Sequence, residues 1–459
     1  MNNQTGLIKY LGISFVVVFF LFGCSSGGGD TDVSGSGTGS GTVSTGSTAN
    51  ITQGRIALPG ELGPLEDIGD LVGAGDNWYD SKIMAIGVDG SVVGQTSYSS
   101  PTKAAFLWDA VSETNTYLGH RNEIYDPTAN PVHPFIYSEA VGIGPDGDVI
   151  CNSTTGFGWP EDTEKRAFYY DHGTVVLLDP VNDGVFSEAH SLNRDYVLFT
   201  AEFDKSAKRR AGRYYKKSDS SFGWLGGIVG ATNTEPVAIN FYNQAVINSE
   251  GTTAVFHDLD VDVVQTLNHL PGASTTTAAA INDSVPTGHI VGTSGTMAFF
   301  WDGGSMYPCG TLGGSTSDAT DLNIHDQVVG FSTTATGATH AFVWVLDAGG
   351  VGMMTDLGTL GGTNSWATAI NDNGLIVGYA ETGEIYSQGG ITQPVVRACA
   401  WYGNVIYDLG VHNDFYTYPF VLPYPFSEAI DVNDLNRIAG NSYTINQHYR
   451  GFVLDSPVP

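Results

Sequence analysis

The amino-acid sequence predicts an all-β fold built from repeated units of four short strands. Three observations predict it: a composition rich in glycine and aromatic residues but poor in charge, short apolar segments that recur in a fixed order, and turn residues between them. Only 14% of the 459 residues are charged, against roughly 25% in an average soluble domain. Glycine accounts for 60 residues, about 13% of the chain, against the usual ~7%. Many short strands with tight turns fit this composition, whereas long helices and general disorder do not.

The first 24 residues predict an export signal. Lys9 precedes an apolar run over residues 11–22, which is shorter than the roughly 20 residues of a membrane-spanning helix and is typical of a secretory signal peptide. Residues 21–24, Leu-Phe-Gly-Cys, resemble a bacterial lipobox, and this resemblance implies that Cys24 is acylated and becomes the mature N-terminus. An ordinary signal peptide that is cut elsewhere is the alternative.

Residues 25–53 predict a disordered tether. They are almost entirely Gly, Ser, Thr, Asp and Asn, so they cannot bury apolar surface, and their root-mean-square reach is roughly 30 Å. Ser25 after the cysteine resembles the outer-membrane sorting pattern of Gram-negative bacteria. The predicted organisation is therefore a signal peptide with lipobox at 1–24, a tether at 25–53 and a folded body at 54–459, lipid-anchored to the outer membrane or the cell surface.

Charge and cysteine content exclude several kinds of partner and site. The 18 Lys and Arg against 48 Asp and Glu give a net charge of −30, which argues against nucleic acid and against a polybasic membrane patch, because both need clustered cations. The remaining cysteines, Cys151, Cys309 and Cys399, are odd in number and widely spaced. We expect them to be small buried apolar residues and not a disulfide framework or a metal site.

Internal repetition divides residues 54–459 into eight units. Each unit contains an aliphatic residue followed by Asn or Gly, then an apolar segment, then an aromatic segment after a small residue, as in Val328–Gly330 and His340–Trp344. The Asn or Gly positions, which number the units from one to eight, are Gly87, Gly144, Asn193, Asn240, Asn282, Asn323, Asn371 and Asn433. They are separated by 41–62 residues, and four strands in such a length are typical of a β-propeller blade.

The sequence thus predicts an eight-bladed β-propeller, with seven blades as the alternative if the divergent units three and four merge. Turns such as 371–374, Asn-Asp-Asn-Gly, supply the positive φ angles that tight hairpins require. The last unit ends at 451–455 without a fourth strand, and an unassigned apolar segment at 65–71 precedes the first unit. We expect this N-terminal strand to complete the last blade and close the ring, because closure leaves few unpaired edges.

Three motifs carry a resemblance to a known family. His-Ala-Phe at 340–342, Asp-Leu-Gly-Thr-Leu-Gly-Gly at 356–362 and Ala-Ile-Asn-Asp-Asn-Gly at 369–374 resemble the bacterial extracellular HAF-repeat family. The match is close over roughly 277–410 and degenerate elsewhere. Units three and four depart most, since Arg-Tyr-Tyr-Lys-Lys at 213–217 replaces the apolar strand. The resemblance implies an exported β-repeat protein and no particular activity.

No catalytic or cofactor motif stands out in the folded body. The Asn-Asp clusters at 282–283, 371–373 and 431–436 lack calcium-loop spacing and are predicted to form Asx turns. His340 is predicted to hydrogen-bond a turn, and no nucleophile elbow occurs in 54–459. We expect neither a cofactor nor a metal and assign no catalytic residue, although a pair of catalytic carboxylates stays open.

Long aromatic loops predict the binding site. Insertions over 120–140 and 412–429, and loops between second and third strands over 154–166 and 381–397, are expected on one rim of units one, two, seven and eight. Aromatic loops on a rigid scaffold are a common binding surface for sugars or hydrophobic partners; packing into a self-contained cap is the alternative. The candidate ligand contacts are Tyr125, Phe135, Tyr137, Trp159, Tyr386, Phe415, Tyr416, Tyr418 and Tyr424.

The predicted function is an exported, lipid-anchored binding module for polysaccharide or protein. A propeller enzyme acting on glycans and an envelope assembly factor are the alternatives. A cluster of Asp, Glu and His in the central pocket would favour the enzyme, an open aromatic rim the binding module, and an exposed strand edge the assembly factor.

Overall fold

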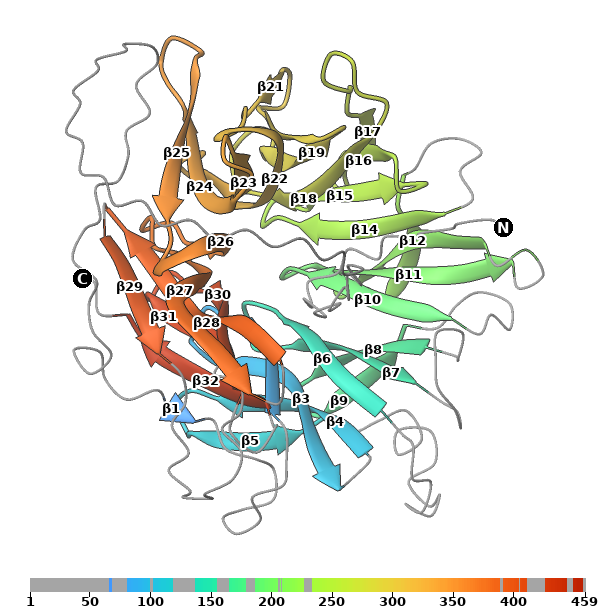
Figure 1. The fold of residues 1–459 in the computed structure, drawn as a ribbon. Coiled ribbons are helices and arrows are strands. Elements are labelled where there is room, and N and C mark those ends of the chain that lie inside the picture. The colour runs from blue at the N-terminus through green and yellow to red at the C-terminus, as the bar shows by residue number, and fades with distance from the viewer. Residues whose placement is uncertain are drawn as a thin grey trace, which may run out of the picture. The chain divides into compact units, whose positions relative to one another are not determined.

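The structure of the protein is a computed structural model. It describes residues 66–67, 81–99, 102–118, 137–154, 165–178, 186–204, 207, 209–226, 233–388, 391–403, 405–410, 426–443 and 449–456. The chain divides into two parts, Met1–Thr48 and Ala49–Pro459, and all described residues belong to the second. This part is all-β, and the ribbon in Figure 1 shows its strands joined by loops. None of the residues described forms a helix long and apolar enough to cross a membrane.

Units three to six are four separate antiparallel sheets of four strands each, in chain order. Unit three contains β10 (Ser187–Leu192), β11 (Tyr196–Asp204), β12 (Arg209–Lys216) and β13 (Ser221–Trp224). Unit four contains β14 (Thr234–Ile239), β15 (Gln244–Ser249), β16 (Thr253–Asp258) and β17 (Val263–Thr266). Unit five contains β18 (Thr276–Ile281), β19 (Ile290–Ser294), β20 (Met297–Trp301) and β21 (Met306–Pro308). Unit six contains β22 (Gly313–Leu322), β23 (Val328–Thr334), β24 (Thr339–Leu346) and β25 (Gly352–Gly358).

The other units form two larger sheets, each made of two four-stranded sets joined by one parallel pair, Lys103↔Tyr137 or Val396↔Phe426. Unit one contains β2 (Ser81–Ile86), β3 (Val92–Ser99), β4 (Thr102–Asp109) and β5 (Thr114–Tyr117). Unit two contains β6 (Tyr137–Ile143), β7 (Val149–Thr154), β8 (Lys165–Asp171) and β9 (Thr174–Leu177). Unit seven contains β26 (Gly361–Ile370), β27 (Ile376–Gln388), β28 (Ile391–Tyr402) and β29 (Val405–Gly410). Unit eight contains β30 (Phe426–Val432), β31 (Arg437–Tyr443) and β32 (Tyr449–Asp455).

The two ends of the folded body pair with each other. The short strand β1 (Glu66–Asp67) lies antiparallel to β32, with Glu66 opposite Val453 and Asp67 opposite Phe452. β1 is therefore the outer neighbour of β32 in the order β1-β32-β31-β30. It falls within the segment 65–71 in which the sequence predicts the missing strand.

The hydrophobic core lies between neighbouring sheets. One cluster joins units five and six through Phe300, Phe342 and Trp344, in which the rings of Phe300 and Trp344 are 5.5 Å apart. Another joins Ile83 and Phe106 of unit one to Ala439 and Val453 of unit eight. The third strands supply most of the largest fully buried side chains, Trp344, Trp401, Phe106, Phe168, Phe299, Phe300, Phe342 and Phe452. Burying each such ring contributes about 1.5–3 kcal/mol, so packing between sheets holds the units together.

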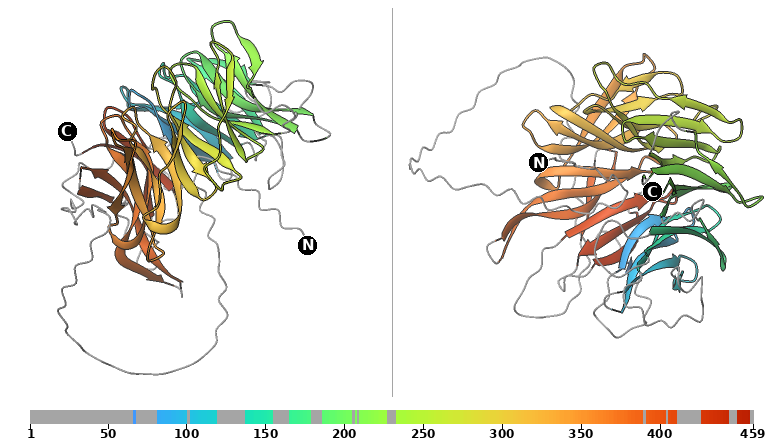
Figure 2. Two further views of the ribbon diagram at one scale, coloured as in Figure 1. Left: turned by 90° about the horizontal axis from the view of Figure 1, so that it is seen from above. Right: turned by 90° about the vertical axis from the view of Figure 1, so that its right-hand side faces the viewer.

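One predicted loop is a strand pair instead. The sequence predicts a long loop over 381–397, but β27 and β28 continue as a hairpin to Gln388 and Ile391, with Tyr386 opposite Gln393. Figure 2 shows the hairpin in orange. The β-branched and aromatic side chains in this segment, among them Ile385, Tyr386 and Thr392, favour extended backbone, which explains the correction. The three cysteines are free and buried, as predicted.

Candidate functional site

Two of the nine predicted ligand contacts, Tyr137 and Tyr386, lie among the described residues. Tyr137 opens β6 and its hydroxyl donates a hydrogen bond to Oε2 of Glu139 at 2.5 Å. Burial and the charge of Glu139 raise the pKa of Tyr137 far above its usual range. Tyr386 is half-buried in β27. Outside the described residues lie Tyr125, Phe135, Trp159, Phe415, Tyr416, Tyr418, Tyr424 and the lipidation residue Cys24, and the aromatic rim stays a prediction.

Glu139, the partner of Tyr137, belongs to a row of side chains on the first strands of the eight units. In every unit the first strand has a buried Ser or Thr, and the next residue occupies one equivalent position. We call these eight residues the first-strand row: Lys82, Glu139, Glu188, Glu235, Thr277, Asp318, Trp366 and Glu428. Six of the eight are charged.

The Ser or Thr before each row residue fixes the first strand to the unit before it. The backbone N–H of Ala167 donates to Ser187 Oγ at 2.9 Å, and that of Ala341 donates to Ser365 Oγ at 2.9 Å. A buried hydroxyl that satisfies a backbone donor sets the register between two sheets. The row residue is therefore held at the same height in successive units.

Three successive units, two, three and four, each have a glutamate at the row position. The ammonium group of Lys165 forms an ion pair with Glu188 and lies 3.9 Å from Oε1 of Glu139, so it links units two and three. Glu235 is exposed to solvent, yet desolvation by the surrounding protein and the charge of Glu188 raise its pKa to about 7. Glu235 thus combines an exposed side chain with a carboxyl that is harder to ionise than in water.

The fourth glutamate of the row is buried beside an aromatic pair. Glu428 is 3% exposed, and burial raises the pKa of its carboxyl, against the opposing charge of Lys82. Its Oε2 has no hydrogen-bond partner within the described part of the chain. The charge of Glu428 also helps to raise the pKa of Tyr379, whose ring stacks on Trp366 at 5.0 Å and 24°. A carboxylate and a stacked aromatic pair thus lie together in units seven and eight.

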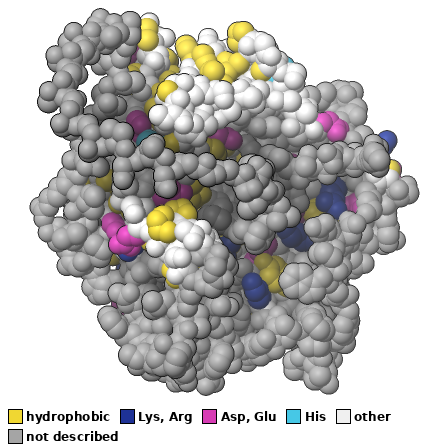
Figure 3. Space-filling view, viewed as in Figure 1, with side chains coloured by type: hydrophobic (Ala, Val, Ile, Leu, Met, Phe, Trp, Pro, Cys, Tyr) yellow, Lys and Arg dark blue, Asp and Glu magenta, His cyan; other side chains and the backbone are white. Residues whose placement is uncertain are grey.

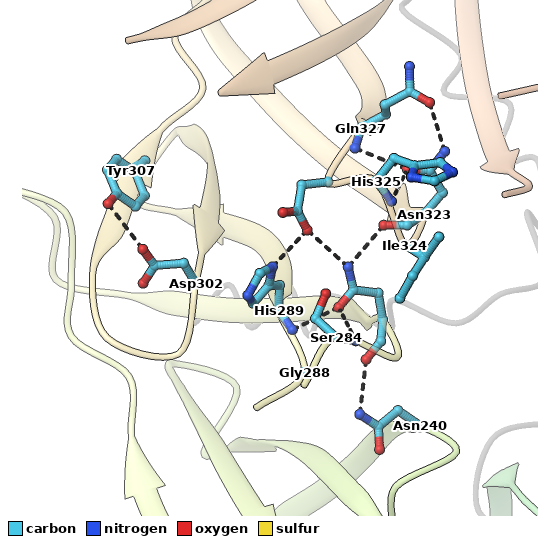
Figure 4. Close-up of polar contacts among 12 residues, drawn as sticks. Asn240, Ser284, Gly288, His289, Asp302, Tyr307, Asn323, Ile324, His325 and Gln327 are labelled. Atoms are coloured by element: carbon cyan, nitrogen blue, oxygen red, sulfur yellow. Dashed lines mark hydrogen bonds and ion pairs between the residues drawn. The ribbon is translucent and has the colours of Figure 1, made fainter. Parts of the chain in front are cut away.

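The Asn residues that number the units form a second network, shown for unit five in Figure 4. Oδ1 of Asn282 accepts from the backbone N–H groups of Ser284 and His289, at 3.2 and 2.8 Å. Its Nδ2 donates to the carbonyl of Asn323 at 2.9 Å, and its own carbonyl accepts from Asn240 Nδ2 at 2.9 Å. We call this chain of side-chain amides the asparagine ladder: Asn193, Asn240, Asn282, Asn323, Asn371 and Asn433.

The ladder has a structural role, because its amide groups are satisfied on both sides. Next to this ladder residue, Nδ1 of His289 lies 2.7 Å from Oδ1 of Asp326, which also accepts from Asn282. Where unit two has Gly144 instead of Asn, Lys217 Nζ donates to the carbonyl of Asn193 at 2.6 Å and pairs with Asp148 of unit two. The predicted Asx turns are therefore also links between units. In the described part of the chain, no group of three or more His, Cys, Asp or Glu could hold a metal ion.

His340 hydrogen-bonds a residue of the neighbouring strand β25 and not a turn, which corrects the prediction. Its Nδ1 lies 2.8 Å from Oδ2 of Asp356, whose Oδ1 accepts from the N–H of Gly358 at 2.8 Å. The hydrogen bond to Asp356 raises the pKa of His340. Unit seven has the same arrangement with arginine, because Arg397 donates to Asp408 at 2.9 Å.

The first-strand row had a sequence signal. Ser-Glu-Ala occurs at 138–140, 187–189 and 427–429, which places Glu139, Glu188 and Glu428 at one position of the repeat. Two of these tripeptides come at the ends of long insertions, which hides their equivalence to the third. Glu235 follows Thr instead of Ser, and only the register of β14 with β15 makes it equivalent.

Comparisons with known proteins give similar folds only. No protein-family model matches the chain, and no curated protein matches it. Solved structures similar to it include the beta-propeller domain of the Trilobed protease from Pyrococcus furiosus (TM-score 0.41, 10% identity, covering 69% of this chain and 95% of that one) and the WD40 domain of SCAP from fission yeast (0.41, 10%, 86% and 99%). TolB from Acinetobacter baumannii is also similar (0.31, 11%, 70% and 79%). At these values the likeness supports no inference about ligand, partner or activity.

Proposed function

We propose that residues 54–459 form a closed ring of eight HAF-type blades, which acts as an exported binding module for polysaccharide. Closure is supported by the contacts between units eight and one, which repeat those between interior units. Asn433 Nδ2 donates to the carbonyl of Gly87 at 3.0 Å, as in the rest of the ladder. The N–H of Gly451 donates to Ser81 Oγ at 3.0 Å, as Ala341 does to Ser365.

A matched pair of variants tests closure. Asn441 of unit eight accepts from the N–H of Ile83 at 2.8 Å and donates to its carbonyl at 3.2 Å. Asn248 of unit four makes the same two contacts with Ala278, at 2.9 and 3.1 Å. In a closed ring Asn441→Ala and Asn248→Ala lower the free energy of unfolding by similar amounts in urea denaturation. If Asn248→Ala lowered the free energy of unfolding and Asn441→Ala left it unchanged, the units would form an open array.

The binding function is carried by the first-strand row. First strands of propeller blades line the central axis, so closure would bring the row together at one level. Carboxylates accept hydrogen bonds from hydroxyl and ammonium groups, and the partly buried ring of Trp366, stacked on the buried Tyr379, offers an apolar face. Sugars present both hydroxyl groups and flat apolar faces, so a polysaccharide chain is the ligand class that fits this set of side chains.

A glycan array with the mature protein tests binding, comparing wild type with Glu188→Gln and Glu235→Gln. We expect each change to weaken the bound glycan at least tenfold, about 1.4 kcal/mol, because a charged acceptor becomes neutral. Glu113→Gln, on the exposed turn of unit one, is the control and keeps wild-type binding. Unchanged binding in both row variants would reject the site, provided that they melt at the wild-type temperature.

A second candidate function is cleavage of the bound glycan. Desolvation and the charge of Glu188, which is paired with Lys165, raise the pKa of Glu235 to about 7, and a carboxyl with a raised pKa near a second carboxylate is the pattern of glycoside hydrolysis. Release of new reducing ends from the glycan that the array identifies would support an enzyme. If the bound glycan stays intact after prolonged incubation, the enzyme is rejected and binding without cleavage remains as the function.

The lipid anchor at Cys24 and the place on the outer membrane belong to the same proposal. They rest on the lipobox-like residues 21–24 and the tether that follows them. Labelling with a clickable fatty acid, comparing wild type with Cys24→Ala, tests the anchor. Equal label in both proteins would reject it.

A further inference from the structure

Unit three concentrates the positive charge of an otherwise acidic chain. Eight of the 18 Lys and Arg lie within residues 194–217, together with only three Asp and Glu. Figure 3 shows Lys and Arg side chains in dark blue on the right of the view, where Figure 1 draws β10, β11 and β12. Because the full chain carries a net charge of −30, this unit is where an anionic ligand would meet the least repulsion.

Arg213 is the centre of an aromatic cluster in this unit. It lies in β12 directly opposite Phe199 of β11 and Trp224 of β13. Its guanidinium carbon is 4.7 Å from the ring centre of Trp224, 5.5 Å from that of Phe222 and 5.8 Å from that of Phe199. These are cation–π distances, so the rings hold the guanidinium in place.

The outer rings of the cluster are open to solvent. Trp224 is 49% exposed, Phe222 42% and Phe203 37%, and Phe203 meets Trp224 edge to face at 6.0 Å. We call Phe203, Arg213, Phe222 and Trp224 the Trp224 surface. Arg and Trp are the residue types that dominate binding hot spots, and contiguous exposed rings are typical of an interface.

Arg213 also has unused hydrogen-bonding capacity. It is 8% exposed, and its Nε has no hydrogen-bond partner within the described part of the chain. Burial lowers its pKa. The Nε is enclosed by the protein, so a ligand on the surface would meet the positive charge of the guanidinium group, which favours an anionic group nearby.

We propose that the Trp224 surface binds an acidic polysaccharide. The flat face of a sugar ring would lie on the exposed rings, and its carboxylate would lie close to the positive charge of Arg213. Arg209, exposed and on the same face of β12 as Arg213, supplies a second cation for a neighbouring acidic sugar. Exposed rings that can stack on a flat sugar face, next to cations that attract its carboxylates, favour an acidic polysaccharide over an acidic peptide, which has no such face.

This site is independent of the first-strand row. It lies on β11, β12 and β13, whereas the row residue of unit three, Glu188, lies on β10. The row is acidic and the Trp224 surface is basic, so the two would accept ligand groups of different charge. A loss of binding at one is therefore distinguishable from a loss at the other.

Calorimetric titration of the full-length protein with polygalacturonate tests the proposal, with dextran as the neutral polymer. We expect Trp224→Ala to weaken polygalacturonate binding at least tenfold and added salt to weaken wild-type binding. Phe241→Ala is the matched control, because Phe241 is 51% exposed and lies 5.4 Å from the guanidinium carbon of Arg194; it keeps wild-type affinity. Arg213→Lys, which keeps the charge but loses the planar fork, also weakens binding.

Three outcomes overturn the proposal. Equal affinity of wild type and Trp224→Ala would remove the surface as the site. Equal binding of dextran would remove the role of the negative charge. Tighter binding of poly-glutamate than of polygalacturonate, lost in Trp224→Ala, would assign the surface to an acidic protein segment. Glu188→Gln and Glu235→Gln keep polygalacturonate binding whether or not the proposed function of the row holds.

Discussion

Units six and three use the same framework for different chemistry. In unit six Phe342 on the third strand lies opposite Asp356 on the fourth, and in unit three Arg213 lies opposite Trp224 at the equivalent positions. Phe342 is fully buried and Asp356 holds His340. Arg213, in contrast, lies under rings that reach the solvent.

The framework itself is the same in both units. Asn323 and Asn193 both accept backbone N–H groups of their own turn and donate to the next unit. The third strands of both donate to the hydroxyl of the following unit, Ser365 or Thr234. The turns and first strands therefore fix how one unit packs on the next. The residues that lie opposite each other on the third and fourth strands can differ from unit to unit and can take on different functions.

The largest expected effect separates the two tryptophans. Trp344 of unit six is fully buried, so Trp344→Ala lowers the free energy of unfolding by about 3–5 kcal/mol. Trp224→Ala in unit three changes it by less than about 1 kcal/mol, because half of the ring is already in water. Urea denaturation of both variants measures the difference. Equal losses would mean that Trp224 belongs to the core and not to a binding surface.

The next effect tests whether the framework is shared. Asn371→Ala removes two hydrogen bonds, the one that Oδ1 accepts from the N–H of Leu375 and the one that Nδ2 donates to the carbonyl of Asn433. We expect the free energy of unfolding to fall by about 2–3 kcal/mol, because these buried partners are left unpaired. Asn193→Ala in unit three has a similar effect. Chemical denaturation of the two variants makes the comparison, with Asn371→Asp as an intermediate that keeps the acceptor. A much smaller loss at Asn193 would mean that unit three is held by other contacts.

A smaller effect concerns pH. The pKa of His340 is raised in the folded state by its hydrogen bond to Asp356, so the pair stabilises the fold fully below the unfolded pKa of about 6.5. This contribution, about 1 kcal/mol or less, is lost as the pH rises through the folded pKa. His340→Arg, which copies Arg397 with Asp408 in unit seven, removes that loss. Unfolding midpoints from pH 5 to 9 measure it, and a parallel fall in both proteins would contradict the assignment.

The smallest effect is at Glu235. Its folded pKa is raised to about 7, so the protonated carboxyl contributes stability below the unfolded pKa of about 4.3, which is lost as the pH rises through about 7. Glu235→Gln removes this pH-dependent part of the free energy of unfolding. It amounts to only a few tenths of a kcal/mol, because the side chain is exposed and screened. Melting temperatures at pH 5 and pH 8 test it. An unchanged slope in the variant would mean that the carboxyl is ionised at pH 5.

Much of the framework could be predicted from the sequence, because it repeats. The Asn positions predicted the turns, and the segment 65–71 predicted the strand that pairs with β32. What the Asn amides bond to could not be predicted, because their partners are backbone carbonyls 41–62 residues away, or 346 residues away for Asn433. The hairpin over 381–397 was missed because a long insertion between strands was taken as a loop.

The Trp224 surface could not be predicted for a different reason. The alternation of side chains along β13 indicates that Phe222 and Trp224 share a face of the sheet. Because both faces of a unit's sheet pack on neighbouring units, the alternation does not indicate which side chains are exposed to solvent. The departure of 213–217 from the repeat was visible in the sequence, and only the register Arg213↔Trp224 turned it into a site. As ligand contacts, all nine aromatic residues of the predicted rim stay a prediction, and seven of them lie outside the described residues.

The asparagine ladder has a consequence for how such a chain can change over evolutionary time. Each rung joins a side chain of one unit to a backbone carbonyl of the next, and every residue type offers that carbonyl. A duplicated unit therefore brings its own donor and finds an acceptor ready in whatever neighbour it receives. Gene duplication can lengthen the array, and single units can diverge as unit three has, without a compensating mutation elsewhere.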